Sequence, residues 1–188
     1  MLTPDDLRYI RSQFSTLEAL CIGRGEQPAA VRLQIRDRVM PAPTYVLDDG
    51  TEMFPPDYFA LVDDAGGVGE LRASFFERYA RAAGPRTPES EITVEWEAYL
   101  SGVYGACLVR VSPETIYEKE SLVKSLGARL AEPRIDDAEW RRCVRRDVSR
   151  LDELEREFAP CDRQRFGGSV SRDRLITAPR ALYPDLFA

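Results

Sequence analysis

Apolar and polar positions along the first third of the chain predict three helices, a β-hairpin and a fourth helix. Leu7, Ile10 and Phe14 lie on one face behind a Thr-Pro start, the pattern of a capped amphipathic helix. Two further helices are expected near 16–23 and 28–38. In the second of these, apolar and polar residues alternate, which fits a strand as well as a helix. We predict a helix because its alanines and arginines favour one and because a strand there would lack a partner.

The hairpin is indicated by two short runs of strand-forming residues around a tight turn. Pro41 and Pro43 end the preceding helix, and Tyr45–Leu47 then supplies the first strand. Asp49-Gly50 is a strong two-residue turn signal, because both residues tolerate positive φ. Glu52–Phe54 returns as the second strand, and a helix is expected to start at Asp57.

This order of elements resembles the winged-helix module of MerR-like regulators. The residues that carry the resemblance are the link Val39-Met40-Pro41-Ala42-Pro43, the wing Asp49-Gly50-Thr51-Glu52-Met53-Phe54 and the following Pro56-Asp57-Tyr58-Phe59-Ala60-Leu61. The resemblance implies a recognition helix over 28–38, which makes Arg32, Arg36 and Arg38 candidate DNA-binding residues.

Acidic residues of the same module disfavour DNA as the partner. Glu52 stands where the regulators often carry Arg, and Asp48 and Asp49 lie beside it. Residues 1–64 contain 6 arginines and 11 acidic residues, a balance of −5. Carboxylates repel phosphates, and phosphate contacts dominate affinity for DNA.

The rest of the chain predicts an all-helical domain. A linker is expected at 63–67, and apolar stripes then indicate helices over 70–83, 92–108, 113–130 and 136–158. The predicted fold is therefore mainly α with one small β-hairpin: a MerR-like winged helix-turn-helix at 1–64, followed by a helical bundle at 65–188. The arginine-rich face of the longest helix is interpreted as solvated rather than as a phosphate track.

Two stretches of the helical domain carry candidate ligand-binding residues. In the first, aromatic residues surround Gly102 and Gly105; it is either part of the core or a pocket wall where glycines let a ligand approach. The second, 161–176, combines Gly167-Gly168 with serines and arginines that could bind a phosphate or carboxylate, or pair with acidic helices instead. The candidates are Tyr99, Tyr104, Arg165, Ser169, Ser171, Arg172 and Arg174.

Four motifs together resemble a family of small uncharacterised bacterial proteins associated with natural-product biosynthesis. They are Tyr45–Gly50, Pro55–Phe59, Tyr99–Gly105 and Arg165–Arg174. The resemblance implies a setting in secondary metabolism and transfers no catalytic residue.

Composition removes several kinds of chemistry. The 188 residues include no histidine, which excludes Ser-His and Cys-His nucleophiles. The four cysteines lie far apart in the sequence, so we expect free thiols, no metal and no cofactor. The net charge is −6, no apolar run could span a bilayer, and the acidic N-terminus lacks an export signal, which predicts a cytoplasmic protein.

The sequence favours a binding or regulatory module with a degenerate winged helix. Its partner would be a small-molecule metabolite, a pathway protein or a second copy of the chain. The alternative is an enzyme of natural-product assembly with a metal-free site between the helical domain and the 163–174 loop. A third interpretation is a scaffold protein that binds no small molecule. No catalytic residue can be assigned.

Overall fold

The computed structural model describes residues 1–187 and is mainly helical, with 63% of the chain in helices and a small antiparallel sheet, which confirms the predicted mainly α class. The first part of the chain contains α1 (Pro4–Gln13), β1 (Ser15–Thr16), α2 (Leu17–Cys21), α3 (Pro28–Arg36), β2 (Tyr45–Val46), β3 (Glu52–Phe54) and α4 (Ala60–Ala65). The second part contains α5 (Val68–Ala83), α6 (Glu89–Leu100), α7 (Val103–Cys107), α8 (Pro113–Ala131), α9 (Ala138–Leu154) and α10 (Asp162–Arg165). A final helical run follows, made of a π-helical turn (Asp173–Thr177), α11 (Ala178–Leu182) and a 3₁₀ turn (Pro184–Leu186).

The first helices begin where their caps predict. The Thr3 hydroxyl accepts a hydrogen bond from the Asp6 N–H, and Pro4 occupies the first turn of α1. The ambiguous stretch after Gln27 is the helix α3, as predicted, and Pro28 occupies its first turn.

The sheet has three strands rather than the two that the hairpin predicted. β2 and β3 form the expected hairpin, in which Gly50 adopts a φ of +82°. β1 pairs with the other edge of β3, which gives the strand order β1-β3-β2. The additional strand escaped prediction because Thr16 also caps α2, so its sequence matches a helix start.

Several expected boundaries differ from the structure. The helix expected from Asp57 begins at Ala60, and those expected near 16–23 and 28–38 end at Cys21 and Arg36. The expected linker at 63–67 is mostly helical, because α4 extends to Ala65 and only two glycines separate it from α5. The helix predicted over 92–108 is broken between α6 and α7 at Gly102, where φ is +76°. The last long helix ends at Leu154, because the next residues pair with an extended segment: the Arg156 N–H donates to Cys107 O at 2.9 Å.

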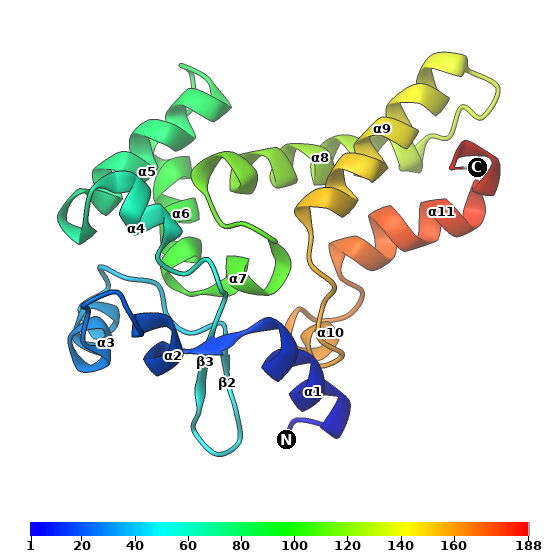
Figure 1. Ribbon diagram of the computed structural model, residues 1–188. Helices are drawn as coiled ribbons and strands as arrows, with labels where there is room; N and C mark the ends of the chain where they lie inside the picture. The colour runs from blue at the N-terminus through cyan, green and yellow to red at the C-terminus, as the bar shows by residue number, and fades with distance from the viewer. Residues whose placement is uncertain (188) are drawn as a thin grey trace.

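Three clusters of buried side chains hold these elements together. The largest contains residues from both sides of position 64, among them Phe54, Tyr58, Phe75 and Trp96. A second joins α8, α9 and the final helical run, and a third joins the sheet and α1 to the chain around Ala159. The first and third clusters thus bind the N-terminal module to the helical part (Figure 1).

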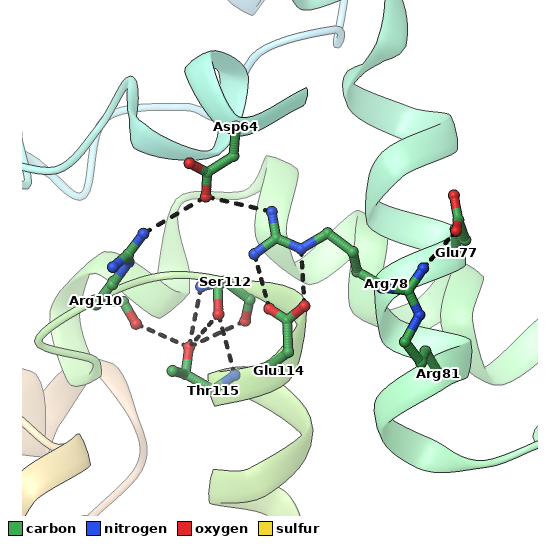
Figure 2. A network of polar contacts seen from close by, with 8 residues as sticks. All are labelled: Asp64, Glu77, Arg78, Arg81, Arg110, Ser112, Glu114 and Thr115. Atoms are coloured by element: carbon green, nitrogen blue, oxygen red, sulfur yellow. Dashed lines mark hydrogen bonds and ion pairs between the residues drawn. The ribbon is translucent and has the colours of Figure 1, made fainter. Parts of the chain in front are cut away.

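A polar network fastens α4 and α5 to the start of α8 (Figure 2). The Arg78 guanidinium forms two hydrogen bonds to Glu114, at 2.8 and 2.9 Å, and an ion pair with Asp64 at 3.4 Å. The bond to Arg78 lowers the pKa of Glu114 to about 2. A bidentate contact between an arginine and a carboxylate is stronger than a typical surface ion pair, so this contact fixes the N-terminal end of α8.

Among residues 1–187, no helix combines the length and the apolar character that crossing a membrane requires.

Candidate ligand-binding cleft

A cleft of about 410 Å³ lies between α7, α8 and the chain from Phe158 to Arg174. Figure 1 shows where these helices lie in the fold. Side chains of three kinds line it. The apolar ones are Val103, Val123, Phe158, Phe166 and Val170; the hydroxyl and thiol groups belong to Tyr104, Cys107, Ser169 and Ser171; the charged ones are Lys119, Glu120, Lys124 and Arg174. Clefts of this size and mixed lining are typical of small-molecule sites.

Local sequence directs these side chains into the cleft. On α8, Lys119, Glu120, Val123 and Lys124 are spaced so that they share one face of the helix. The α7 residues Tyr104 and Cys107 are three positions apart and likewise share a face.

On the opposite wall, a glycine pair turns the chain. Gly167 and Gly168 have φ values of +76° and +138°, which side-chain-bearing residues rarely adopt. The turn brings Ser169 and Ser171 back toward α8.

A buried ion pair adjoins the cleft through Lys119, which lines it. Lys119 Nζ lies 3.4 Å from Glu155 Oε1, and the two side chains are 15% and 0% exposed. The Ser171 hydroxyl donates to the same carboxylate oxygen at 2.5 Å. Burial opposes the charge of Lys119, but contacts with Cys107 and Glu155 outweigh it and raise the Lys119 pKa above its ordinary value. Burial raises the pKa of Glu155, which the Lys119 charge partly offsets.

A second set of polar contacts lies on the side of the cleft near α6. The Tyr104 hydroxyl donates to the Glu95 carboxylate, and the Tyr79 hydroxyl donates to Glu120 at 3.4 Å. Burial and contact with Glu95 raise the pKa of Glu120 to about 7. Near neutral pH Glu120 therefore retains its proton for much of the time, which reduces the negative charge at the wall.

Two cations at the rim are available to a ligand. Among residues 1–187, neither Lys124 nor Arg174 forms an ion pair, whereas most arginines of the chain do. An anionic group placed between them would meet positive charge without displacing an existing partner.

The structure gathers four of the seven predicted ligand-binding residues in this cleft: Tyr104, Ser169, Ser171 and Arg174. The other three lie elsewhere. Tyr99 lines a separate cavity of about 20 Å³, room for about one water molecule. Arg165 donates to the Thr44 carbonyl at 2.9 Å, and Arg172 pairs with Asp152 at 2.6 Å.

The glycines near Tyr99 make room for the protein's own backbone. A Cβ on Gly102 would lie 2.3 Å from the Ala42 carbonyl oxygen, and one on Gly105 would lie 2.1 Å from Thr44 Oγ1. Packing against the link before β2 therefore explains these glycines, and the core interpretation of this aromatic face agrees with the burial of Trp96 and Tyr99.

Sequence reasoning missed Cys107, Lys119, Glu120 and Glu155. Lys119 and Glu120 have the spacing of ordinary solvated helix residues, and Glu155 follows a long run of charged residues. The only indication in the sequence was that Lys119 and Val123 are four residues apart, so they lie on the same face of the predicted helix.

Each candidate DNA-binding arginine lies against a carboxylate. Arg32 forms ion pairs with Glu18 and with Glu52 of the hairpin, both at 2.7 Å. Arg36 pairs with Asp37 at 3.0 Å, and Arg38 pairs with Glu97 of α6.

The four cysteines are free, and three of them are buried. Within the described chain, no group of three or more His, Cys, Asp or Glu side chains is placed to hold a metal ion.

Comparison with known sequences finds a family model that covers most of the helical part. The model described as "Family of unknown function (DUF6058)" matches residues 71–184, more than half of the chain and all of the cleft. No curated protein and no solved structure matches the chain.

Proposed function

The chain belongs to the family of unknown function DUF6058, and we propose that it binds, in the cleft, a small molecule that combines an apolar body with an anionic group. The observation that carries this proposal is the cleft itself, in which apolar walls lead to two rim cations without ion-pair partners among residues 1–187. The matched range of the family model contains every residue that lines the cleft.

The lining selects the ligand class. Phe158, Phe166 and the valines provide apolar contact, which favours an alkyl or aromatic body. Lys124 and Arg174 favour a carboxylate, sulfonate or phosphate at the rim. The raised pKa of Glu120 reduces the repulsion that an acidic wall would exert on such a ligand.

The N-terminal module is proposed to be a degenerate winged-helix-like unit that does not bind DNA. The order β1-α2-α3-β2-β3 and the strand order β1-β3-β2 support the winged-helix assignment. The ion pairs of Arg32 with Glu18 and Glu52 argue against phosphate contacts, since an arginine that binds phosphate would have to leave both carboxylates.

A place in natural-product biosynthesis is a proposal that rests on the motif resemblance alone. An intermediate of such a pathway with an apolar body and an acidic group would have the chemistry that the cleft selects. The enzymatic alternative uses the same cleft.

The binding proposal is tested with 8-anilinonaphthalene-1-sulfonate, a fluorescent probe with an apolar body and one anionic group. We expect saturable binding of one probe per chain. The double variant Lys124→Ala/Arg174→Ala should weaken it by roughly 5- to 30-fold, the effect of losing two interactions of about 0.5–1 kcal/mol each. The charge-matched control Arg86→Ala/Arg145→Ala removes two exposed cations away from the cleft and should leave the affinity unchanged.

A neutral probe separates the contribution of charge from that of apolar contact. N-phenyl-1-naphthylamine has the same rings without the sulfonate, so the Lys124→Ala/Arg174→Ala variant should bind it as the parent chain does. Val123→Trp places a large side chain in the cleft and should abolish binding of both probes. Equal sulfonate affinity in the rim variant and its control, or binding that Val123→Trp leaves intact, would refute the proposal.

A further inference from the structure

The hydroxyl of Ser171 faces the cleft and contacts a carboxylate, as the hydroxyl of a catalytic serine contacts its general base. Its Oγ is within 2.5 Å of Glu155 Oε1, and the Ser171 side chain also lines the cleft. A serine becomes a useful nucleophile when a neighbouring base accepts its proton. Since the chain has no histidine, another side chain has to act as that base, and the Glu155 carboxylate is already in hydrogen-bond contact.

Glu155 is held in a state that suits this task. Its side chain is fully buried, and its Oε2 has no hydrogen-bond partner among residues 1–187. Lys119 Nζ, 3.4 Å from Oε1, keeps a negative charge tolerable at this depth. Burial also raises the Glu155 pKa, which makes the carboxylate a better proton acceptor than an exposed one.

Lys119 extends the arrangement toward the ligand. It lines the cleft from α8, while Ser171 lines it from the opposite segment. Its ammonium group therefore offers positive charge to an oxygen that becomes negative when Ser171 attacks a carbonyl carbon. Nucleophile, base and electrostatic stabiliser come from three separate parts of the chain, and Glu155 contacts both Ser171 and Lys119, which line the cleft.

We infer that Ser171, with Glu155 as general base and Lys119 as electrostatic stabiliser, makes the cleft an acyl-transfer site for an ester with an apolar acyl group. This inference rests on the proposed function, since the same cleft has to bind the substrate.

The step uses only the ester and water. The Ser171 oxygen bonds to the carbonyl carbon while its proton moves to Glu155. The bond from that carbon to the leaving alcohol then breaks, and Glu155 returns the proton to the departing alkoxide. Water attacks the resulting acyl-serine in the same way, which releases a carboxylic acid and restores the free hydroxyl.

The inference is tested on the full chain with two probes: p-nitrophenyl butyrate as a chromogenic ester, and an alkyl fluorophosphonate that adds covalently to activated serines. We expect a single adduct on the peptide that contains Ser171, together with steady release of p-nitrophenolate. Ser171→Ala should remove the adduct and lower ester turnover at least about 100-fold. Ser121→Ala, which removes an exposed hydroxyl of α8 outside the cleft, should change neither.

Glu155→Gln separates a base from a structural partner. The amide still accepts a hydrogen bond from Ser171 but takes up no proton, so turnover should fall about 10²- to 10⁴-fold. In the parent chain, turnover should rise with pH as Glu155 ionises, and the variant should lose that dependence. Thermal unfolding and anilinonaphthalene sulfonate binding establish that each variant still folds; if Glu155→Gln does not, the pH profile and the adduct of the parent chain decide the matter.

Three results would overturn the inference: no adduct, an adduct on another residue, or equal turnover in Ser171→Ala and the parent chain. If the sulfonate probe binds with the expected dependence on Lys124 and Arg174 while Ser171 stays unmodified, acyl transfer is wrong and the binding proposal stands. If the sulfonate probe does not bind either, both fail.

Discussion

Gly102 is the position where the structure predicts the largest effect of adding one methyl group. The residue has a φ of +76°, and an alanine Cβ there would lie 2.3 Å from the Ala42 carbonyl oxygen. The link cannot readily move away, since the Ala42 N–H donates to Leu100 O at 2.8 Å and the Thr44 hydroxyl donates to Gly102 O at 3.2 Å. Left-handed backbone costs an alanine about 1–2 kcal/mol, and overpacking adds about 1–3 kcal/mol.

Gly102→Ala should therefore lower the free energy of unfolding by about 2–5 kcal/mol. Urea unfolding followed by far-ultraviolet circular dichroism measures this change. Gly127→Ala is the matched control: its Cβ would meet nothing within 4 Å on α8, and alanine should stabilise the helix by about 1 kcal/mol. If Gly102→Ala stayed within about 1 kcal/mol of the parent chain, the close approach of the link to α7 would be wrong.

Three further predictions concern single side chains. Tyr45→Phe removes a donor, 2.7 Å from the fully buried carboxylate of Asp162, and should destabilise the chain by about 1–3 kcal/mol in urea unfolding; an unchanged midpoint would contradict the contact. Glu120 has a pKa of about 7 in the folded chain against an ordinary value of 4.5, so the folded state binds the proton more tightly and the stability should fall as the pH rises across that interval. Glu120→Gln should reduce this pH dependence in urea midpoints measured at several pH values. A pH dependence that the substitution leaves unchanged would refute the assignment. A duplex shift assay at low salt should show no complex, because Arg32 is paired with two carboxylates, and a complex that Arg32→Ala abolishes would restore DNA as the partner.

The local signals of the sequence predicted much of the fold. Thr3 and Ser112 each cap a helix, and Asp49-Gly50 turns the hairpin, because these effects depend on neighbouring residues alone. The strand β1 escaped prediction because two residues form it, and its pairing with β3 spans a sequence separation of nearly forty residues. The helix break at Gly102 also escaped prediction, because it depends on a close approach to Ala42 and Pro43, which lie about 60 residues earlier in the sequence.

The candidate site was predicted only where its residues were chemically conspicuous. Ser169, Ser171 and Arg174 stood out in a glycine-serine-arginine loop, and they do line the cleft. Lys119 and Glu155 look like solvated charges in the sequence, and only packing across 36 residues brings them together. An arginine gives no sign of whether it faces a ligand or a carbonyl, which is why Arg165 was grouped with Arg174 although it binds the chain at Thr44.

The position of Arg165 links the two parts of the molecule. The segment from Phe158 to Arg174 lines the cleft at one place and holds the hairpin at another, through the bond of Arg165 to Thr44 O and that of Tyr45 to Asp162. A ligand that contacts Phe158, Phe166 and Arg174 would stabilise this segment, and with it the hairpin, because binding to the folded state alone lowers the population of opened states. Amide hydrogen exchange of the β2–β3 hairpin should therefore slow when anilinonaphthalene sulfonate occupies the cleft, although the probe lies outside the N-terminal module. Tyr45→Phe should weaken this coupling without removing probe binding. If the amide exchange rates of the hairpin were the same with and without bound probe, the shared segment would not couple the cleft to the hairpin.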